Sequence, residues 1–459
     1  MLNRDSVALA FVVLLGIGPV NAAVSPEKAK ELGNTLTPFG AIAAGNKEGT
    51  IPAYDANAFN GVRVTNGELG KPTTLTSPFK DERPILRIDA KNMQQYEDKL
   101  SEGQRQLLTT RAGYFLNVYP THRTASYPDE ILHKTVANAT TCKTLQEGDA
   151  LDQSCRGGLP FPVPTTGKEV MWNKIATWMG PALSFDSYNF TMTPSGRAIL
   201  GSMVWQYRDF VYYAKETANP GAMITVIGDV KEPKRNAGAR NLLQEYLNSE
   251  TSGAARGVWV YTPGQRRVRR EPNSGYDTPN STSGGLFLDD EIYLFSGKMD
   301  RWDMKLVGKK EMYIPYNGFG LLGERCNTDE LLKPDTVNPE CERWELHRVW
   351  VVEATLKPGA RHVHSKRIYY FDEDSYLSGF YEAWDQAGKI TRAAYASSFP
   401  VPENKLSVQS PLAYYDFNKP GYSVTSYIGN KAGLTLYSSD QKMPERELSP
   451  DALQGSGIR

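Results

Sequence analysis

Hydrophobic and polar residues alternate along much of the chain beyond residue 185, which is the pattern of β-strands. The best-marked case is the stretch 257–270, where Trp259 and Tyr261 alternate with valines. A period of two gives a strand two unlike faces. Residues 262–265 then read Thr-Pro-Gly-Gln and predict a tight turn, because proline fixes φ and glycine accepts positive φ. The chain returns as Arg-Arg-Val-Arg-Arg, so a β-hairpin is predicted.

Further stretches share this strand pattern. They are 204–213, 223–230, 291–295, 304–314, 344–357, 364–371, 376–384 and 389–396. The last three are joined by short turns rich in acidic residues and glycine, which favours antiparallel pairing. Because residues 257–317 combine the hairpin with two more strand-like runs, we expect this stretch at the centre of the sheet.

Helical patterns are fewer than strand patterns. Ser101 and Gln104 have the spacing of a capping box and predict the start of a helix. Residues 168–179 place most of their apolar side chains on one helical face, with Trp172 at its edge. Residues 241–248 read Asn-Leu-Leu-Gln-Glu-Tyr-Leu-Asn and predict another helix, set between strands.

These patterns predict an α+β chain that is mainly β. Residues 33–88 show no sustained period and are rich in Gly, Pro and Thr, so they predict a long segment that lies against another part of the molecule. We divide the chain into a signal peptide at 1–22, a loop-and-helix arm at 23–165 that packs on the sheet, an antiparallel β domain at 166–442, and a polar C-terminal tail at 443–459.

The N-terminus predicts export from the cytoplasm. An apolar run from Val7 to Gly18 follows Arg4, and small residues at Val20 and Ala22 precede a cleavage site. This run is too short to span a bilayer and has the features of a secretory signal. No later stretch has the roughly 18 apolar residues that a membrane helix needs. We therefore expect a soluble exported protein, cleaved near Ala22.

Four cysteines fit an oxidising compartment. Cys142 and Cys155 bracket one polar loop, and Cys326 and Cys341 bracket another. Four cysteines allow three pairings, of which proximity in the sequence favours the two local bridges. Each bridge would stabilise the fold by roughly 3 kcal/mol. A four-thiolate zinc site is the alternative, although the sequence has no C-x-x-C pair.

Charge and motifs argue against several classes of function. The 52 basic and 52 acidic residues balance, so the chain lacks the basic surplus that general nucleic-acid binding needs. Residues 318–323 match a dinucleotide fingerprint, but Pro315 interrupts the preceding strand and no apolar helical run follows. The sequence contains no G-x-S-x-G motif. We identify no catalytic residue and no cofactor, and predict that the chain is not an enzyme.

Some polar clusters were weighed as sites. His362 and His364 lie two apart on a predicted strand and could ligate a metal, but no third ligand is apparent, so we predict no metal site. The acidic runs 289–291 and 372–374 flank strands, and turn chemistry accounts for them. The arginines of 266–270 could partly face inward toward an anionic head-group, but we expect an exposed hairpin arm.

Several segments resemble a family of Gram-negative envelope proteins, the domain of unknown function thirteen-twenty-nine. The most specific are GVWVYTPGQRRVRR and KLVGKKEMYIPYN, and the resemblance extends from AGNKEGTIPAYD to GARHVHSKRIYYFDEDSY. Two features depart from the family pattern: residues 56–60 replace the usual glycines, and His364 replaces an aromatic residue. The resemblance implies a fold similar to the periplasmic Lol-type lipoprotein carriers (LolA/LolB-like), which is a strongly curved antiparallel sheet, or incomplete barrel, with helices on its concave side.

Relatives of that fold carry lipid chains between the sheet and the helices. The leading hypothesis is therefore a periplasmic protein that binds or shuttles a hydrophobic or lipidic ligand. The candidate ligand contacts are the aromatic side chains Trp172, Trp205, Tyr207, Trp259, Tyr261 and Trp350. The alternative is a docking module for an exporter or outer-membrane protein, with the arm as its contact surface, and a hydrolase is the third hypothesis.

Overall fold

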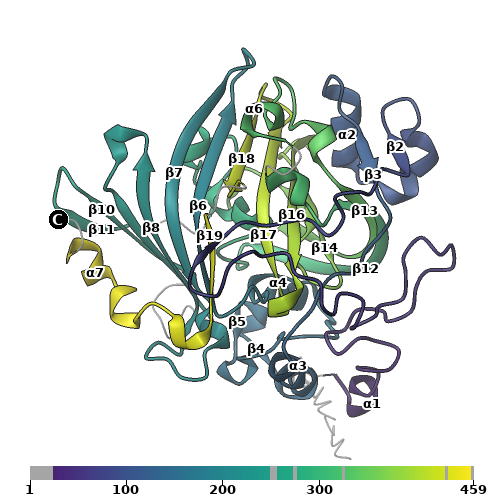
Figure 1. Cartoon of the computed structure of the whole chain (residues 1–459), viewed down its shortest axis with the longest axis horizontal. Helices are drawn as coiled ribbons and strands as arrows, with labels where there is room; N and C mark the ends of the chain where they lie inside the picture. Colours follow the sequence, from purple (N-terminus) through teal and green to yellow (C-terminus); the bar gives the residue numbers. More distant parts are fainter. Residues whose placement is uncertain (1–23, 249–255, 272–275, 323–325, 430–432, 456–459) are drawn as a thin grey trace, which may run out of the picture.

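One large antiparallel sheet dominates the computed structural model, which describes residues 24–248, 256–271, 276–322, 326–429 and 433–455. The sheet curves round without closing (Figure 1), which confirms the predicted mainly-β fold. In spatial order its main strands are β11 (Arg267–Arg270), β10 (Arg256–Thr262), β9 (Arg240–Tyr246), β8 (Ala222–Glu232), β7 (Ala198–Asp209), β6 (Ala182–Met192), β18 (Tyr422–Tyr427), β17 (Leu406–Asp416), β16 (Ile390–Val401), β15 (Gly379–Trp384), β14 (Lys366–Asp372), β13 (Trp344–Leu356) and β12 (Trp302–Pro315).

Short strands and helices surround this sheet. The strands are β1 (Pro72–Thr73), β2 (Leu86–Ile88), β3 (Leu116–Val118) and β19 (Leu434–Tyr437), with a separate pair β4 (Thr144–Leu145) and β5 (Ala150–Leu151). The α-helices are α1 (Pro26–Ala29), α2 (Glu102–Thr110), α3 (Asp129–Thr141), α4 (Gly167–Ile175), α6 (Thr328–Leu331) and α7 (Pro450–Gly455). Within the described ranges, no helix has the length and apolar character needed to cross a membrane. The predicted signal peptide lies outside these ranges.

The hairpin predicted at 257–270 is confirmed, but its place in the sheet is not. Trp259 of β10 faces Arg270 of β11 across the pair. Among the described strands, β11 pairs with β10 alone, and β12 pairs with β13 alone. The stretch 257–317 therefore supplies both free edges of the sheet, and the expectation that it forms the centre is wrong. Residues 276–301, which we call the crossing segment, connect the two edges.

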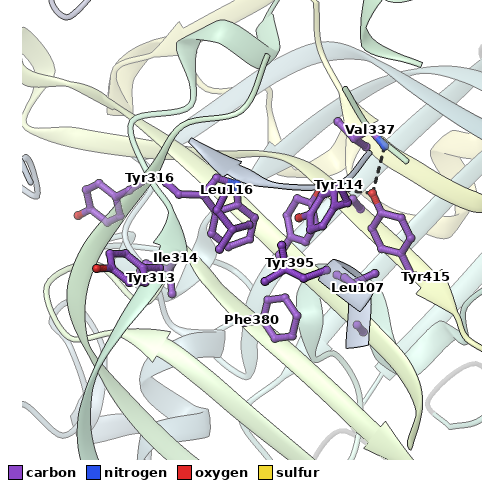
Figure 2. Close-up of a cluster of buried hydrophobic side chains, with 14 of the residues drawn as sticks. Leu107, Tyr114, Leu116, Tyr313, Ile314, Tyr316, Val337, Phe380, Tyr395 and Tyr415 are labelled. Carbon is purple, nitrogen blue, oxygen red and sulfur yellow. Dashed lines mark hydrogen bonds between the residues drawn. The ribbon is translucent and has the colours of Figure 1, made fainter. Parts of the chain in front are cut away.

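The convex face of the β12–β18 half is covered by α2 and neighbouring parts of the arm. Phe380, Tyr395 and Tyr415 of three successive strands pack in one cluster with Leu107 of α2 and with Tyr114 (Figure 2). The predicted capping box is present at the start of α2, because the Ser101 hydroxyl accepts from the Gln104 N–H and the Gln104 side chain accepts from the Ser101 N–H. The helix thus begins where the sequence indicated and buries its apolar side on the sheet.

Two elements differ from their predictions. Residues 241–248 form strand β9 rather than a helix. Leu242 is buried on the convex side and Leu243 faces the concave side, so apolar residues are needed on both faces and the strand loses its alternation. The strand predicted at 291–295 lies mostly in a 3₁₀ turn, η7 (Asp289–Leu294), where Tyr293 and Leu294 have positive φ. The carboxylates beside it hold this turn, as described below.

Both predicted disulfides are present, Cys142–Cys155 and Cys326–Cys341. The predicted helix at 168–179 is α4, which ends at Ile175. Gly167 begins α4 against strand β12, where a Cβ on this residue would lie 2.6 Å from the Met304 carbonyl oxygen. A glycine at this point lets the helix pack directly on the concave face of the sheet.

Candidate functional site

The crossing segment is fixed to the concave face by buried ion pairs. Both carboxylate oxygens of Asp290 accept from the Arg367 guanidinium of β14 at 3.0 Å, and the Glu291 carboxylate accepts from Arg392 of β16 at 3.2 Å. These side chains are all almost completely buried. Paired and hydrogen-bonded charges of this kind are costly to separate. Turn chemistry explains the acidic run 289–291 only in part: Glu291 accepts from the Leu288 N–H at the start of the turn, but Asp290 and Glu291 also hold the segment to the sheet.

Two histidines belong to the same network. His362 Nε2 lies 3.0 Å from Asp290, and His364 Nε2 lies 3.0 Å from Glu291. Burial lowers the pKa of His364 to about 4, although Glu291 acts in the opposite direction. Burial alone would raise the pKa of Glu291, but Arg392 and His364 bring it far below its ordinary value. At neutral pH His364 is therefore uncharged, and the Glu291 carboxylate is ionised beside Arg392.

Apolar side chains fill the remaining space over the strands that the crossing segment covers. Phe287 stacks on Tyr414 with ring centroids 4.3 Å apart, and Phe295 meets Tyr369 edge-on at 5.8 Å. Buried residues of α4 belong to the same cluster. We call this region, the concave face over β13–β17, the sealed half.

Beside the sealed half, the concave face over β6–β10 encloses a cavity of about 840 Å³. Its other walls are α4 and the crossing segment, and Tyr414 of β17 closes one side. The apolar part of its lining includes Val204, Phe210, Ile224, Val226, Leu243 and Val260. Cavities of this size and character are typical of small-molecule sites. We call this region the open half.

The cavity runs along β7 from a mouth to a buried end. Its lining includes exposed residues of the turns at 235–237 and 263–264, so solvent reaches it there. On β7, Ser202 lies toward this mouth and Arg208 lies at the other end, because β7 pairs with β8 from Met203–Glu232 to Asp209–Thr225. At about 3.3 Å per residue, the six residues from Ser202 to Arg208 span roughly 20 Å. The cavity is therefore long enough for an extended chain.

Two cations line the buried end. Lys174 of α4 and Arg208 of β7 are 5 % and 1 % exposed. The Arg208 guanidinium lies between the rings of Phe185 and Tyr293, at 4.7 and 4.6 Å from their centroids. It donates to Gln206 Oε1 at 3.1 Å, while its Nε has no hydrogen-bond partner. In the described ranges, no carboxylate lies within 4.0 Å of either cation.

Burial makes both positive charges costly. It lowers the pKa of Lys174 to about 7, with the nearby Arg208 charge adding to the effect. It also lowers the pKa of Arg208. A buried cation without a carboxylate is uncommon, because the lost hydration is not replaced. The end of the cavity is thus a region of uncompensated positive charge.

Helix α4 holds Lys174 in place. Thr166 caps the helix, with its hydroxyl accepting from the Glu169 N–H. The Asn173 amide accepts from the Phe161 N–H and donates to the Phe161 carbonyl, at 2.9 and 2.7 Å. The Asn173 side chain is thus tied to the backbone of Phe161, which fixes the helical turn that carries Lys174.

The six aromatic residues predicted as ligand contacts lie away from this cavity. Trp205, Tyr207, Trp259 and Tyr261 belong to a cluster on the opposite, convex face, which Leu448 and Leu453 of the C-terminal tail cover. Figure 1 shows α7 of this tail beside β10 and β11. Trp172 borders a separate void of about 50 Å³, and Trp350 is buried in the sealed half. A ligand role for these six stays a prediction, and the cavity points to other residues.

Sequence reasoning did not single out Lys174 and Arg208. A signal was present for both. Arg208 shares one face of its strand with Val204 and Gln206, and Tyr207 lies on the opposite face. Lys174 lies one residue before Ile175 on a helix that is otherwise buried. A charged residue on an otherwise apolar or buried face is a signal of a functional site, because such positions are rarely charged without a partner.

A second buried cluster lies at the turn after β14. Arg123 of the arm donates to both carboxylate oxygens of Asp374, at 2.9 and 2.7 Å, and Lys309 donates to Glu373 at 2.6 Å. His347, Asp372 and Asp374 place possible ligand atoms within 4.8 Å of one another. Since Asp374 is already committed to Arg123, the cluster is explained by holding the arm to the sheet.

Comparison with known proteins gives matches over most of the chain. A family model described as "Protein of unknown function (DUF1329)" matches residues 87–454. An uncharacterised protein from Pseudomonas aeruginosa is 35% identical over an alignment of 459 positions, which covers 96% of this chain and 95% of that protein. The matched range includes both halves of the concave face.

Two solved structures were also compared. A DUF1329 family protein from Desulfovibrio piger aligns with a TM-score of 0.42 and 12% identity, over 62% of this chain and 97% of its own. A LolA superfamily protein from Nitrosomonas europaea aligns with a TM-score of 0.35 and 11% identity, over 63% of this chain and 99% of its own.

Proposed function

The chain belongs to the DUF1329 family of proteins of unknown function, and we propose that it binds or shuttles a hydrophobic ligand in the cavity of its open half. The family predicted from the sequence is thereby confirmed. The observation that carries the proposal is the cavity of about 840 Å³, walled by apolar side chains and reached through exposed turns. Burying apolar surface there supplies about 25 cal/mol per Å² before ordering costs.

Two features support the cavity as the site. The crossing segment and α4 leave it open although they fill the neighbouring half of the same face. Its floor is a continuous sheet, so the walls are held by strand pairing and not by loops alone. Preformed sites bind with a smaller ordering cost than sites that must close on the ligand.

The test compares two adjacent strands of the same sheet. Leu243 of β9 lines the cavity, whereas Trp259 of β10 faces the tail on the convex side. Binding of the neutral fluorescent probe N-phenylnaphthylamine is measured on the wild type, on Leu243→Trp and on Trp259→Leu. Leu243→Trp should reduce affinity about tenfold or more, which corresponds to ~1.4 kcal/mol. Trp259→Leu should retain wild-type affinity.

Equal probe binding by wild type and Leu243→Trp would contradict the proposal. Native mass spectrometry of gently purified protein gives a second readout, because a bound hydrophobic molecule should co-purify with wild type and be lost from Leu243→Trp.

We place the protein in the periplasm as part of the same proposal. Its support is the signal-like N-terminal sequence and the two disulfides, which are typical of oxidising compartments. The docking hypothesis stays a prediction. The arm on which it relied is tied to the sheet through the Arg123–Asp374 pair and through Arg348, which donates to the Ala44 carbonyl at 2.9 Å.

A further inference from the structure

We propose that the ligand of this cavity is a single-chain amphiphilic anion, which enters with its charged group first and places it between Lys174 and Arg208. This inference rests on the proposed function and deepens it. The shared chemistry is one apolar chain that ends in a small anion such as a carboxylate or a phosphate monoester.

Lys174 and Arg208 differ from the other buried cations of the concave face, which are paired with carboxylates. Arg367 and Arg392, in the sealed half of the same face, each have a buried carboxylate partner. Lys174 and Arg208 have none among the described residues, and burial removes most of their hydration. A site that keeps two such charges is matched to a ligand that brings the negative charge with it.

Other charged groups of the cavity do not fill this role. Glu245 lines the cavity, but it accepts from Arg256 at 2.8 Å and from the Ser296 hydroxyl at 2.9 Å. Arg235 also lines it, at the exposed turn near the mouth. The positive charge therefore lies at both ends, while the apolar walls lie between them.

The position of the cations sets the orientation and the size of the ligand. They lie at the buried end, roughly 20 Å along β7 from Ser202 near the mouth, counting about 3.3 Å per residue. A bound anion there requires its chain to extend from the level of Val226, which pairs with Arg208, toward Val204 and Val230 nearer the mouth. Arg208 lies against the rings of Phe185 and Tyr293, so we expect a bulky diacyl head-group to fit this end less well than a small anion.

The side chains around the anion can do more than supply charge. Within the described part of the chain, the Arg208 Nε has no hydrogen-bond partner, so this donor is available to an oxygen of the ligand. Lys174 adds up to three N–H donors. Charge-assisted hydrogen bonds to a carboxylate are about twice as strong as neutral ones. Recognition of the anion thus adds selectivity to the apolar binding of the chain.

The experiment compares matched ligands by displacement of N-phenylnaphthylamine. Palmitate and hexadecyl phosphate carry the anion on one chain, hexadecanol has the chain without the charge, and acetate and inorganic phosphate have the charge without the chain. Palmitate or hexadecyl phosphate should bind about tenfold or more tightly than hexadecanol. Dipalmitoyl phosphatidylglycerol, supplied as vesicles, should bind more weakly than either single-chain anion.

The matched variants are Lys174→Met, Arg208→Gln and the control Lys305→Met, at an exposed lysine of β12. Lys174→Met and Arg208→Gln should lose the preference for palmitate over hexadecanol. Lys174→Met should also raise the melting temperature of the ligand-free protein, since it removes a buried charge. Lys305→Met should change neither quantity.

The outcomes separate this inference from the proposed function. Equal affinity of wild type for palmitate and hexadecanol, or an unchanged preference in both Lys174→Met and Arg208→Gln, would overturn the inference and leave the proposed function standing. Binding of acetate or phosphate as tight as that of palmitate would show an anion site without a chain site and would overturn it as well. Failure of every chain-bearing ligand to displace the probe would contradict both.

Discussion

The two halves of the concave face differ in whether their buried charges have partners of opposite charge. In the sealed half, Asp290 and Glu291 enter on the crossing segment and meet Arg367 and Arg392. In the open half, Lys174 and Arg208 line a cavity without a described carboxylate within reach. The first arrangement stabilises the fold by holding a long connection in place. The second costs stability in the ligand-free protein, which is typical of a site built for a ligand.

The largest effect should come from breaking the charge compensation of the sealed half. Arg367→Met leaves Asp290 buried without its guanidinium and should lower the free energy of unfolding by about 3–5 kcal/mol. Urea denaturation monitored by tryptophan fluorescence measures this. The double variant Asp290→Asn with Arg367→Met is the control, and should be more stable than the single variant. A loss below about 1 kcal/mol for Arg367→Met, as for a surface pair, would contradict the distinction.

A larger side chain should also destabilise the sealed half more than the open half. Ala394 of β16 is fully buried in the sealed half, so Ala394→Leu should cost about 1–3 kcal/mol of unfolding free energy by overpacking. Leu243→Trp adds a larger side chain into the open half and should cost less, because the space is already present. The same denaturation experiment compares the two. If Leu243→Trp were the more destabilising, the cavity would not be the empty space described.

Removing a buried cation from the open half should stabilise the protein, whereas removing one from the sealed half destabilises it. Lys174→Met should raise the free energy of unfolding of the ligand-free protein by roughly 1–3 kcal/mol, because it removes a buried cation that has no carboxylate partner among the described residues. Lys305→Met, at an exposed position, should stay within about 0.5 kcal/mol of wild type. A destabilised Lys174→Met protein would mean that the lysine has a compensating partner.

The smallest effect is a pH dependence. The pKa of Lys174 is about 7 in the folded chain, lowered by burial and by Arg208, and about 10.4 when unfolded. Above pH 7 the unfolded chain therefore binds more protons at this residue, and stability rises with pH until the unfolded lysine also loses its proton.

This dependence is measured as urea midpoints between about pH 8 and pH 9.5, below the ordinary pKa of tyrosine. The other charged or titratable groups that face Lys174 across the cavity should not cause the same rise in stability with pH. Arg208 stays positive, burial raises the pKa of Tyr414, and Glu245 is paired with Arg256. The urea midpoint of wild type should rise over this range relative to that of Lys174→Met. If the midpoints of the two proteins changed with pH in the same way, the lowered pKa of Lys174 in the folded chain would be contradicted.

Local patterns predicted the strands but not which side of them is concave. Alternation and the Thr-Pro-Gly-Gln turn located the hairpin of β10 and β11, since both signals lie within a few residues. The same alternation separates Trp259 from Val260 without telling which one faces the cavity. The aromatic pattern predicts a ligand on the side of Trp259, yet the tail covers that side through Leu448 and Leu453. That choice depends on contacts between residues nearly 200 positions apart.

The charge network could not be read from the sequence for the same reason. Asp290 and Arg367 are 77 positions apart, and each looks locally like an ordinary polar residue beside a strand. The period of β7 places Arg208 on the same face as Val204, but it does not tell that this face is the concave one. The capping box at Ser101 and both disulfides were predicted correctly, because their partners are near in sequence.

The open form of the sheet has a consequence for self-association. An unclosed sheet exposes strand edges that can pair with another molecule, which is a route to aggregation. The two edges avoid it by different means. Beside β12 lies the segment 93–100, with Lys310 donating to the Leu100 carbonyl at 2.9 Å, and Gly308 makes a bulge in the strand. Strand β11 instead carries the exposed charges of Arg267, Arg269 and Arg270, so the basic hairpin repels a second copy of itself and keeps the chain dispersed at high local concentration.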